Sequence, residues 1–260
     1  MTRPGAAAWL DACMAEIRVG VFGVGGKMGR EVAAAVAGAE GMDVIGGVDL
    51  GDDRDAVARA QVVVDFTHPD AVMDNIEWCL DRDISMVIGT TGFTAARLER
   101  VRALCAAHPR VGVLIASNFS IGAVLMMRFA ATAAAFYPSV EVVELHHPNK
   151  ADAPSGTATT TAGMIAAARA QAGLGQVPDA TVHDPDGARG AVVDGVHVHA
   201  VRMESLVAHQ EVLFGGHGET LTIRHDSFDR KSFMPGVVAA VRHVVDHPGL
   251  TQGIDGVLGL

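Results

Sequence analysis

The alternation of apolar runs with helical segments in the first 119 residues most constrains the fold. A strand that is buried on both faces appears as a short, continuously apolar run, whereas a half-buried strand alternates apolar and polar residues. Five such runs occur, at 17–22, 42–50, 61–69, 85–92 and 111–119, and helical segments at 27–38, 70–83 and 94–107 separate several of them. Strands that alternate with helices predict an α/β domain with a parallel sheet covered on both faces.

The pattern changes after Asn118. A long helix is expected at 121–136, a strand at 140–147 and a helix at 157–172, whereas 173–195 shows no clear period. Three strands without helices between them follow at 196–203, 207–215 and 219–227, and a last helix is expected at 232–246. Adjacent strands joined by short turns predict an α+β domain with an antiparallel or mixed sheet.

These patterns predict two domains after a short extension. We assign 1–16 to an N-terminal extension, 17–119 to the first domain and 120–231 to the second. The C-terminal helical segment, about 232–260, is expected to pack back onto the first domain.

Composition excludes some functions. The net charge of −10 argues against a protein that binds nucleic acid or anionic membranes through a basic surface. No apolar run is long enough to span a membrane, and the first residues lack the apolar core of a signal peptide. Cys13, Cys79 and Cys105 form no paired motif, which indicates free thiols in a reducing compartment.

Glycines mark the turn between the first strand and the first helix, in "VGVFGVGGKMGR". Gly23, Gly26 and Gly29 lie at intervals of three, while Met28 occupies the third glycine position of a strict G-x-G-x-x-G motif. Free N–H groups at a helix N-terminus, approached without Cβ atoms, can bind a pyrophosphate. Asp49 ends the second strand, where a carboxylate can accept hydrogen bonds from an adenosine ribose. A tight turn with no nucleotide, and a turn role for Asp49, remain alternatives.

Two further strand ends carry small and polar residues, "IGTTG" at 88–92 and "ASNF" at 116–119. Ligands of open parallel sheets bind beyond the carboxyl ends of the strands. These residues suit a nicotinamide and its ribose, although ordinary loop chemistry explains them as well.

The stretch 143–168, "VELHHPNKADAPSGTATTTAGMIAAA", gathers unusually many reactive groups. His146 and His147 are adjacent at a strand end and point to opposite faces, so a shared zinc ion is disfavoured, and we predict no metal. Lys150 supplies a local cation, and the Ser155-Gly156-Thr157 turn opens a helix whose N–H groups can bind a carboxylate. Helix capping explains only the turn. An acid, a cation and an anion site together suit reduction of a small carboxylated substrate.

At these residues the chain resembles the 4-hydroxy-tetrahydrodipicolinate reductase (dihydrodipicolinate reductase) family of diaminopimelate and lysine biosynthesis. The resemblance runs from about Ile17 to the C-terminus. It rests on "GVGGKMGR", "VDFTHP", "GTTGF", "ASNFSIGAVL" and, most specifically, "ELHHPNKADAPSGTA". The extension before Met14 departs from the family pattern.

The resemblance implies a role for each motif. His146 would donate a proton, and Lys150 would be a second catalytic and substrate-binding group. His147, Ser155, Gly156 and Thr157 would contact a small dicarboxylate substrate. The cofactor would lie along Gly23, Val24, Gly25, Gly26, Lys27, Met28, Asp49, Gly89, Thr90, Thr91, Ala116, Ser117, Asn118 and Phe119. The resemblance also implies a Rossmann-like first domain, a second domain that binds substrate and forms a cytoplasmic homotetramer, and movement between the two.

Asp49 favours NADH because a carboxylate repels the 2′-phosphate of NADPH. Nearby basic residues can offset the repulsion of the 2′-phosphate. Lys27, within the turn, is expected to offset it more than Arg30 or Arg54. We therefore expect both cofactors to be used, with NADH at least as good as NADPH. Two alternatives stay open: another nicotinamide oxidoreductase, such as an amino-acid dehydrogenase, and a non-catalytic nucleotide sensor. Neither needs the 143–168 loop.

Overall fold

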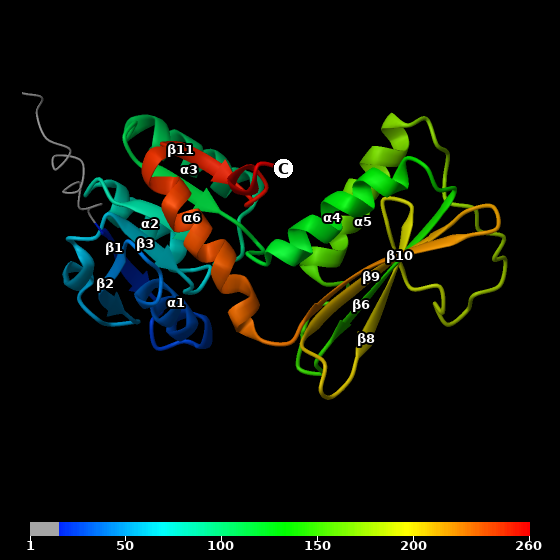
Figure 1. Cartoon of the computed structure of the whole chain (residues 1–260), viewed down its shortest axis with the longest axis horizontal. Helices are drawn as coiled ribbons and strands as arrows, with labels where there is room; N and C mark the ends of the chain where they lie inside the picture. Colours follow the sequence, from blue (N-terminus) through cyan, green and yellow to red (C-terminus); the bar gives the residue numbers. More distant parts are fainter. Residues whose placement is uncertain (1–15) are drawn as a thin grey trace, which may run out of the picture. The chain divides into compact units, whose positions relative to one another are not determined.

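The computed structural model describes residues 16–260 and divides them into two compact units (Figure 1). The first unit contains the described residues up to Ile115 together with Val237–Gln252. The second contains Ala116–Gly236 and Gly253–Leu260. Among residues 16–260, no helix is long and apolar enough to cross a membrane.

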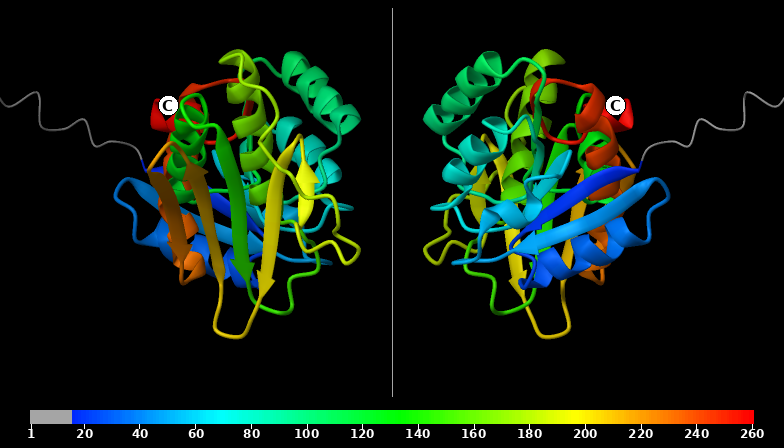
Figure 2. Two further views of the ribbon diagram at one scale, coloured as in Figure 1. Left: turned by 90° about the vertical axis from the view of Figure 1, so that its right-hand side faces the viewer. Right: turned by 90° about the vertical axis from the view of Figure 1, so that its left-hand side faces the viewer.

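The first unit is a six-stranded parallel sheet in the order β11-β5-β4-β3-β1-β2. Its strands are β1 (Ile17–Phe22), β2 (Met42–Val48), β3 (Val62–Asp65), β4 (Ser85–Ile88), β5 (Gly112–Ile115) and β11 (Gly249–Gln252). The helices are α1 (Lys27–Ala37), α2 (Val72–Leu80), α3 (Ala95–Ala107) and α6 (Met234–Asp246). The predicted parallel α/β domain is confirmed, and the right-hand view of Figure 2 shows this sheet with its flanking helices.

Burial explains why these runs become central strands. Every residue of β3, β4 and β5 is buried, and Val62, Val63 and Val64 have no exposed surface. Full burial of a valine or isoleucine side chain contributes roughly 1.5–3 kcal/mol. An amphipathic helix covers this core from outside, as α1 does by burying Val32 and Val36.

The second unit is a mixed five-stranded sheet in the order β10-β9-β6-β8-β7. Its strands are β6 (Ser139–His146), β7 (Ala191–Val193), β8 (Val196–Arg202), β9 (Ala208–Gly215) and β10 (Thr220–Ser227). Strand β6 is parallel to β8 and antiparallel to β9, which confirms the mixed form of the prediction. Helices α4 (Ile121–Ala134) and α5 (Gly156–Gln171) pack on one face, whose core includes Val140, Val142, Val212 and Phe214.

The other face of this sheet carries no helix of the described residues, and its strands lie in front in the left-hand view of Figure 2. This face carries both clusters of acidic, histidine and arginine side chains and exposed aliphatic side chains. Glu141 contacts Arg189 and His199, and Leu213 is 40% exposed.

Several boundaries of the compact units and elements differ from the expected ones. The first unit ends at Ile115 rather than at 119. The helix expected at 232–246 is α6, but the segment 232–260 is not helical throughout, because β11 follows and pairs with β5. Residues 253–260 belong to the second unit, where Asp255 contacts Arg128 and Ile254 packs beside Gly236. The short strand β7 lies inside 173–195, where no period was visible. The predicted extension 1–16, with Cys13, lies almost wholly outside the described residues.

Candidate active site

The glycine turn follows β1 and caps α1 closely. Gly23 has φ +78, and a Cβ on Gly29 would lie 2.0 Å from the Gly23 carbonyl oxygen. Any side chain at Gly29 would therefore push the helix away from the turn. The backbone N–H of Gly25 donates to Asp49 Oδ2 at 2.8 Å, which ties the turn to the end of β2. Asp49 Oδ1 has no hydrogen bond from the described residues and remains available to a ribose hydroxyl.

A cavity of about 360 Å³ adjoins this turn. Of the predicted cofactor residues, Gly23, Gly26 and Asp49 line it. Its polar lining also includes Arg54, which the sequence indicated as a nearby basic residue, and Asp52, Thr67, His68 and Asn75, which were not predicted. The basic residue on this cavity is Arg54, whereas Lys27, expected to be the closer cation, is exposed and does not line it.

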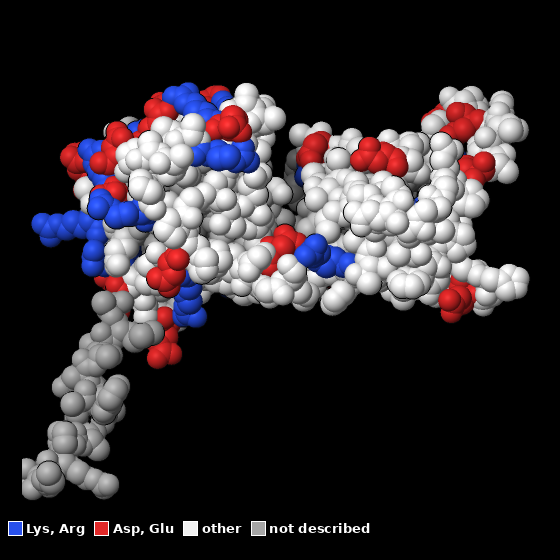
Figure 3. All heavy atoms as spheres, turned by 90° about the horizontal axis from the view of Figure 1, so that it is seen from above, with Lys and Arg blue, Asp and Glu red and all other residues white. Residues whose placement is uncertain are grey.

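The residues present fit a dinucleotide. The turn offers backbone N–H groups without Cβ obstruction, and Asp49 offers a carboxylate oxygen. Charges of both signs are interspersed on the face of the first unit drawn in Figure 3, so local groups rather than a general basic surface must receive an anionic ligand.

Thr90 has a structural role that the sequence did not indicate. Its hydroxyl donates to the buried Asp65 at 2.6 Å and accepts from the backbone N–H of Thr67 at 2.8 Å. Asn75 donates to the same carboxylate at 2.8 Å. Gly89 packs on the Phe66 ring, while Thr91 is exposed. The predicted cofactor contacts at Gly89, Thr90 and Thr91 lie outside the lining of the cavity and stay predictions.

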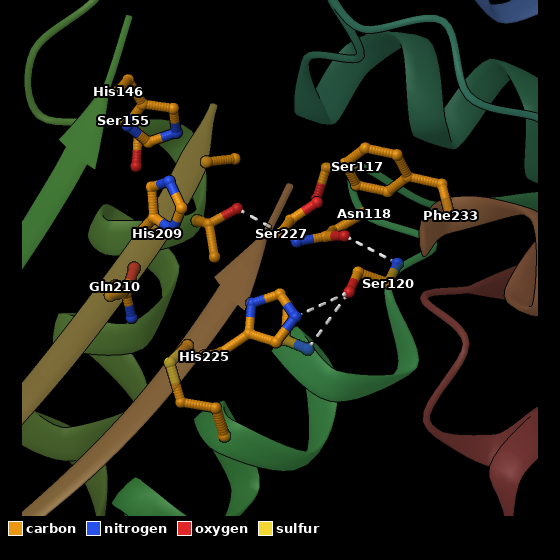
Figure 4. A pocket seen from close by; sticks show the side chains of 14 residues that line it. Ser117, Asn118, Ser120, His146, Ser155, His209, Gln210, His225, Ser227 and Phe233 are labelled. Atoms are coloured by element: carbon orange, nitrogen blue, oxygen red, sulfur yellow. Dashed lines mark hydrogen bonds between the residues drawn. The ribbon is translucent and has the colours of Figure 1, made fainter. Parts of the chain in front are cut away.

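A second cavity, of about 150 Å³, lies within the second unit (Figure 4). It opens between the N-terminal ends of α4 and α5 and the ends of strands β6, β9 and β10. Predicted site residues from three segments meet here: Ser117 and Asn118, His146, and Ser155 and Thr157. Asn118 donates to Thr157 Oγ1 at 3.2 Å, which links the predicted cofactor segment to the predicted substrate segment. Ala116 and Phe119 are buried beside it.

His146 ends β6 and lies against a buried carboxylate. Its Nδ1 is 2.5 Å from Glu144 Oε2, and the Glu144 side chain is fully buried. Burial alone would raise the pKa of Glu144, but hydrogen bonds from Arg202 and His146 outweigh it and hold the pKa below its usual range. Burial lowers the pKa of His146, and the hydrogen bond and charge of Glu144 oppose that shift.

The α5 N-terminus is capped by Ser155, whose Oγ accepts from the Ala158 N–H at 3.2 Å. Nothing lies within 4 Å of a Cβ built on Gly156, so the space beside the first helical residue is open. The N–H groups of this first turn therefore suit a carboxylate.

Lys150 and His147 lie outside the lining of this cavity. Lys150 Nζ donates to Asp152 Oδ1 at 2.6 Å, and that hydrogen bond lowers the pKa of Asp152. The predicted cation thus already holds a carboxylate of its own loop. The roles predicted for His147, Lys150 and Gly156 stay predictions.

Five further polar residues on this cavity were not predicted: Ser120, His209, Gln210, His225 and Ser227. Their positions near the starts of α4, β9 and the end of β10 become visible only when the sheet assembles. His209 Nδ1 lies 2.7 Å from Asp226 Oδ1, and its Nε2 accepts from the Val207 N–H at 3.2 Å, so both ring nitrogens have protein partners. His225 Nε2 lies 3.2 Å from Ser120 Oγ. Within residues 16–260, no group of three or more His, Cys, Asp or Glu side chains is placed to hold a metal ion.

A parallel sheet with a glycine turn and a free carboxylate oxygen, followed by a mixed-sheet unit with an acid-backed histidine, defines the class of two-domain nicotinamide-dependent oxidoreductases. Residues 17–119 match the family model "Dihydrodipicolinate reductase, N-terminus", and residues 122–258 match "Dihydrodipicolinate reductase, C-terminus". The chain belongs to the dihydrodipicolinate reductase family, whose members depend on NAD or NADP.

Curated relatives agree with this assignment. The 4-hydroxy-tetrahydrodipicolinate reductase of Cutibacterium acnes is 63% identical over 244 residues, covering 94% of this chain and 99% of the relative. That of Thermobifida fusca is 60% identical over 245 residues, covering 94% and 100%. A dipicolinate-bound dihydrodipicolinate reductase from Paenisporosarcina sp. TG-14 has a TM-score of 0.81 and 37% identity, covering 93% of this chain and 99% of that one. The predicted resemblance is confirmed, and the two alternatives left open above lose their support.

Proposed function

We propose that this chain reduces 4-hydroxy-tetrahydrodipicolinate, by way of dihydrodipicolinate, to tetrahydrodipicolinate in diaminopimelate and lysine biosynthesis. The observation that carries the proposal is the second-unit cavity, in which His146, backed by Glu144, lies with the Ser155-capped start of α5. A proton donor beside an anion-binding helix end suits a ring that carries carboxylates. The relatives named for this reaction cover 94% of the chain.

Each group has a distinct task in the proposed reaction. The nicotinamide, when bound, supplies a hydride to the ring carbon conjugated with the imine. His146 gives a proton to the neighbouring ring carbon of the resulting enamine, which balances the added hydride. The N–H groups of Gly156 and Thr157 hold one substrate carboxylate. Lys150 binds the substrate by exchanging the Asp152 carboxylate for one from the ring.

The first unit would bind either cofactor, with NADH at least as good as NADPH. Gly25 holds Asp49 through Oδ2, which leaves Oδ1 for a ribose hydroxyl and places a negative charge where a 2′-phosphate would lie. Arg54 lines the same cavity and offsets part of that charge. We therefore expect Arg54, rather than Lys27, to reduce the repulsion of the NADPH 2′-phosphate.

We further propose a cytoplasmic homotetramer that assembles through the helix-free face of the second unit's sheet. That face carries exposed aliphatic side chains such as Leu213 among paired charges, a mixture typical of interfaces between subunits. The resemblance to the family is the main support for this assembly.

The test is an NADH oxidation assay in which the unstable substrate is generated enzymatically in the cuvette. We expect oxidation that depends on the generating enzyme and on this chain together, and inhibition by pyridine-2,6-dicarboxylate. A control supplies 2-oxo acids with ammonia, which an amino-acid dehydrogenase would reduce. Activity with the 2-oxo acids alone would overturn the proposal.

A further inference from the structure

Glu144 is surrounded by hydrogen-bond donors on both of its oxygens. Oε1 accepts from the Ser155 N–H at 3.1 Å and from Arg202 at 2.7 Å. Oε2 accepts from Arg202 at 2.8 Å and lies 2.5 Å from His146 Nδ1. Its side chain is fully buried, and a buried carboxylate stays ionised when it accepts this many hydrogen bonds.

This arrangement determines which His146 nitrogen carries a proton. Glu144 can only accept, so His146 Nδ1 must donate, because two lone pairs would otherwise face each other at 2.5 Å. Arg202 is itself fixed, since it also donates to the Asp152 carbonyl oxygen at 2.7 Å and to the Val201 carbonyl oxygen at 2.8 Å. The guanidinium therefore cannot leave the carboxylate without losing two other hydrogen bonds.

The remaining nitrogen, His146 Nε2, has no hydrogen-bond partner among residues 16–260, and His146 lines the second-unit cavity. His209, on the same cavity, differs because both of its nitrogens are engaged, by Asp226 and by the Val207 N–H. Only a nitrogen without a protein partner can exchange a proton with a ligand at no cost in internal hydrogen bonds. His146 Nε2 satisfies this condition and the nitrogens of His209 do not.

We propose that Glu144, anchored by Arg202, is a positioning residue that keeps the Nδ1 proton on His146, so that Nε2 is the atom that gives its proton to the substrate and later regains one from water. The identity of the substrate in this inference rests on the proposed function. The tautomer of His146 follows from the hydrogen bonds alone. Glu144 would touch neither substrate nor cofactor.

The charges around His146 give the proposal a pH signature. Burial lowers the pKa of His146, as do the charges of Lys150 and Arg202, whereas Glu144 raises it and limits the fall. His209 and His225 also line the cavity. Replacing Glu144 by a neutral amide removes the raising contribution, so the pKa of His146 falls. A reaction that needs protonated His146 must then lose its rate at a lower pH than in the native chain.

The kinetic test compares Glu144→Gln with the matched control Glu141→Gln. Glu141, three residues earlier on β6, also pairs with an arginine and a histidine, at 2.5 Å from Arg189 and 2.7 Å from His199, but it lies outside the cavity. We expect Glu144→Gln to lower kcat by roughly ten- to a hundredfold, less than the ~10²–10⁴-fold that a positioned acid is worth. The alkaline limb of its pH profile should move to lower pH, while the KM for NADH is unchanged. Glu141→Gln should keep the native kcat and the native pH profile, because Glu141 lies outside the cavity.

A measurement on the native chain covers the case in which Glu144→Gln does not fold. Two-bond ¹⁵N–¹H NMR spectra of the histidine rings report the tautomer, and a His146→Gln sample assigns the signal. We expect neutral His146 to carry its proton on Nδ1. A proton on Nε2, or an unchanged pH profile in a folded Glu144→Gln, would overturn the proposal. Because the NMR result requires no turnover, it separates failure of this inference from failure of the proposed function.

Discussion

His146 and Lys150 make different contacts, and their loss should have different consequences. His146→Ala removes the proposed proton donor, and Lys150→Ala removes a cation that now holds Asp152. We expect either change to lower kcat, by ~10²–10⁴-fold for His146→Ala. Lys150→Ala should also raise the KM for the substrate, because a carboxylate loses its counter-charge. Steady-state kinetics with NADH fluorescence titrations checks both. Near-native turnover in either variant would remove that residue from the mechanism.

Asp49 and Arg54 lie on the same cavity with opposite charge, and they should shift cofactor preference in opposite directions. Asp49→Ser relieves repulsion of a 2′-phosphate and should move the ratio of kcat/KM values toward NADPH. Arg54→Ser removes attraction and should move it toward NADH. Lys27→Ser is the matched control, because Lys27 is exposed and does not line the cavity. A larger effect at Lys27 than at Arg54 would mean that the 2′-phosphate lies nearer the turn.

The residues predicted to react belong to a recognisable sequence motif, whereas the residues that hold them in place do not. His146, Ser155 and Thr157 lie in one recognisable stretch of sequence, from the end of β6 to the start of α5, and the structure brings all three to one cavity. Glu144 is two residues from His146 and looked like an ordinary strand residue. Its role depends on Arg202, which is 58 residues away in sequence and reaches it through the parallel pairing of β6 with β8. Residues that meet only because two distant strands pair in a sheet show no recognisable pattern in the local sequence.

At the scale of elements, strand β6 should make the second unit sensitive to acid. Burial raises the pKa of Glu141 and Glu144, but hydrogen bonds from Arg189, His199, Arg202 and His146 outweigh it, so both folded-state pKa values lie below the unfolded ones. Such a group stabilises the fold above its unfolded pKa, and that contribution is lost as the pH falls through the folded value. We therefore expect the melting temperature to fall steeply below about pH 4.

The control for this prediction is Arg189→Gln, which removes the charged partner of Glu141 and leaves Glu144 in place. The variant should be less stable at neutral pH and should lose less stability between neutral and acidic pH. Parallel melting curves for the two chains at every pH would contradict the assignment of acid sensitivity to these pairs.

Two short strands that are not fully buried had no recognisable sequence pattern. Long apolar runs and helical periods predicted the parallel sheet and the change of architecture near residue 119. Strands β7 and β11, of three and four residues, were not predicted. Strands β3, β4 and β5 are as short as β11 but are fully buried, so they appear in the sequence as apolar runs. Neither β7 nor β11 is such a run, and their strand conformation depends on a neighbour, β8 for β7 and β5 for β11.

At the scale of the whole molecule, the family match begins at residue 17. Residues 1–15 lie outside the described part of the chain. We expect a chain that starts at Met14 to fold, assemble and turn over like the full one, because the elements and both cavities lie beyond it. Thermal melting, light scattering and the NADH assay on both chains check this. A large fall in melting temperature, or loss of the oligomer, would show that the first residues contribute contacts.

The central claim is that the second-unit cavity receives the dicarboxylate ring at His146. A crystal structure of this chain with pyridine-2,6-dicarboxylate, a planar analogue of the ring, tests it most directly. We expect one carboxylate on the N–H groups of Gly156 and Thr157, and Lys150 turned from Asp152 toward the ligand. His146 Nε2 should face the ring while Nδ1 stays on Glu144. A ring bound away from His146, or a His146 side chain that leaves Glu144 to reach it, would show that this cavity does not receive the substrate in the proposed way.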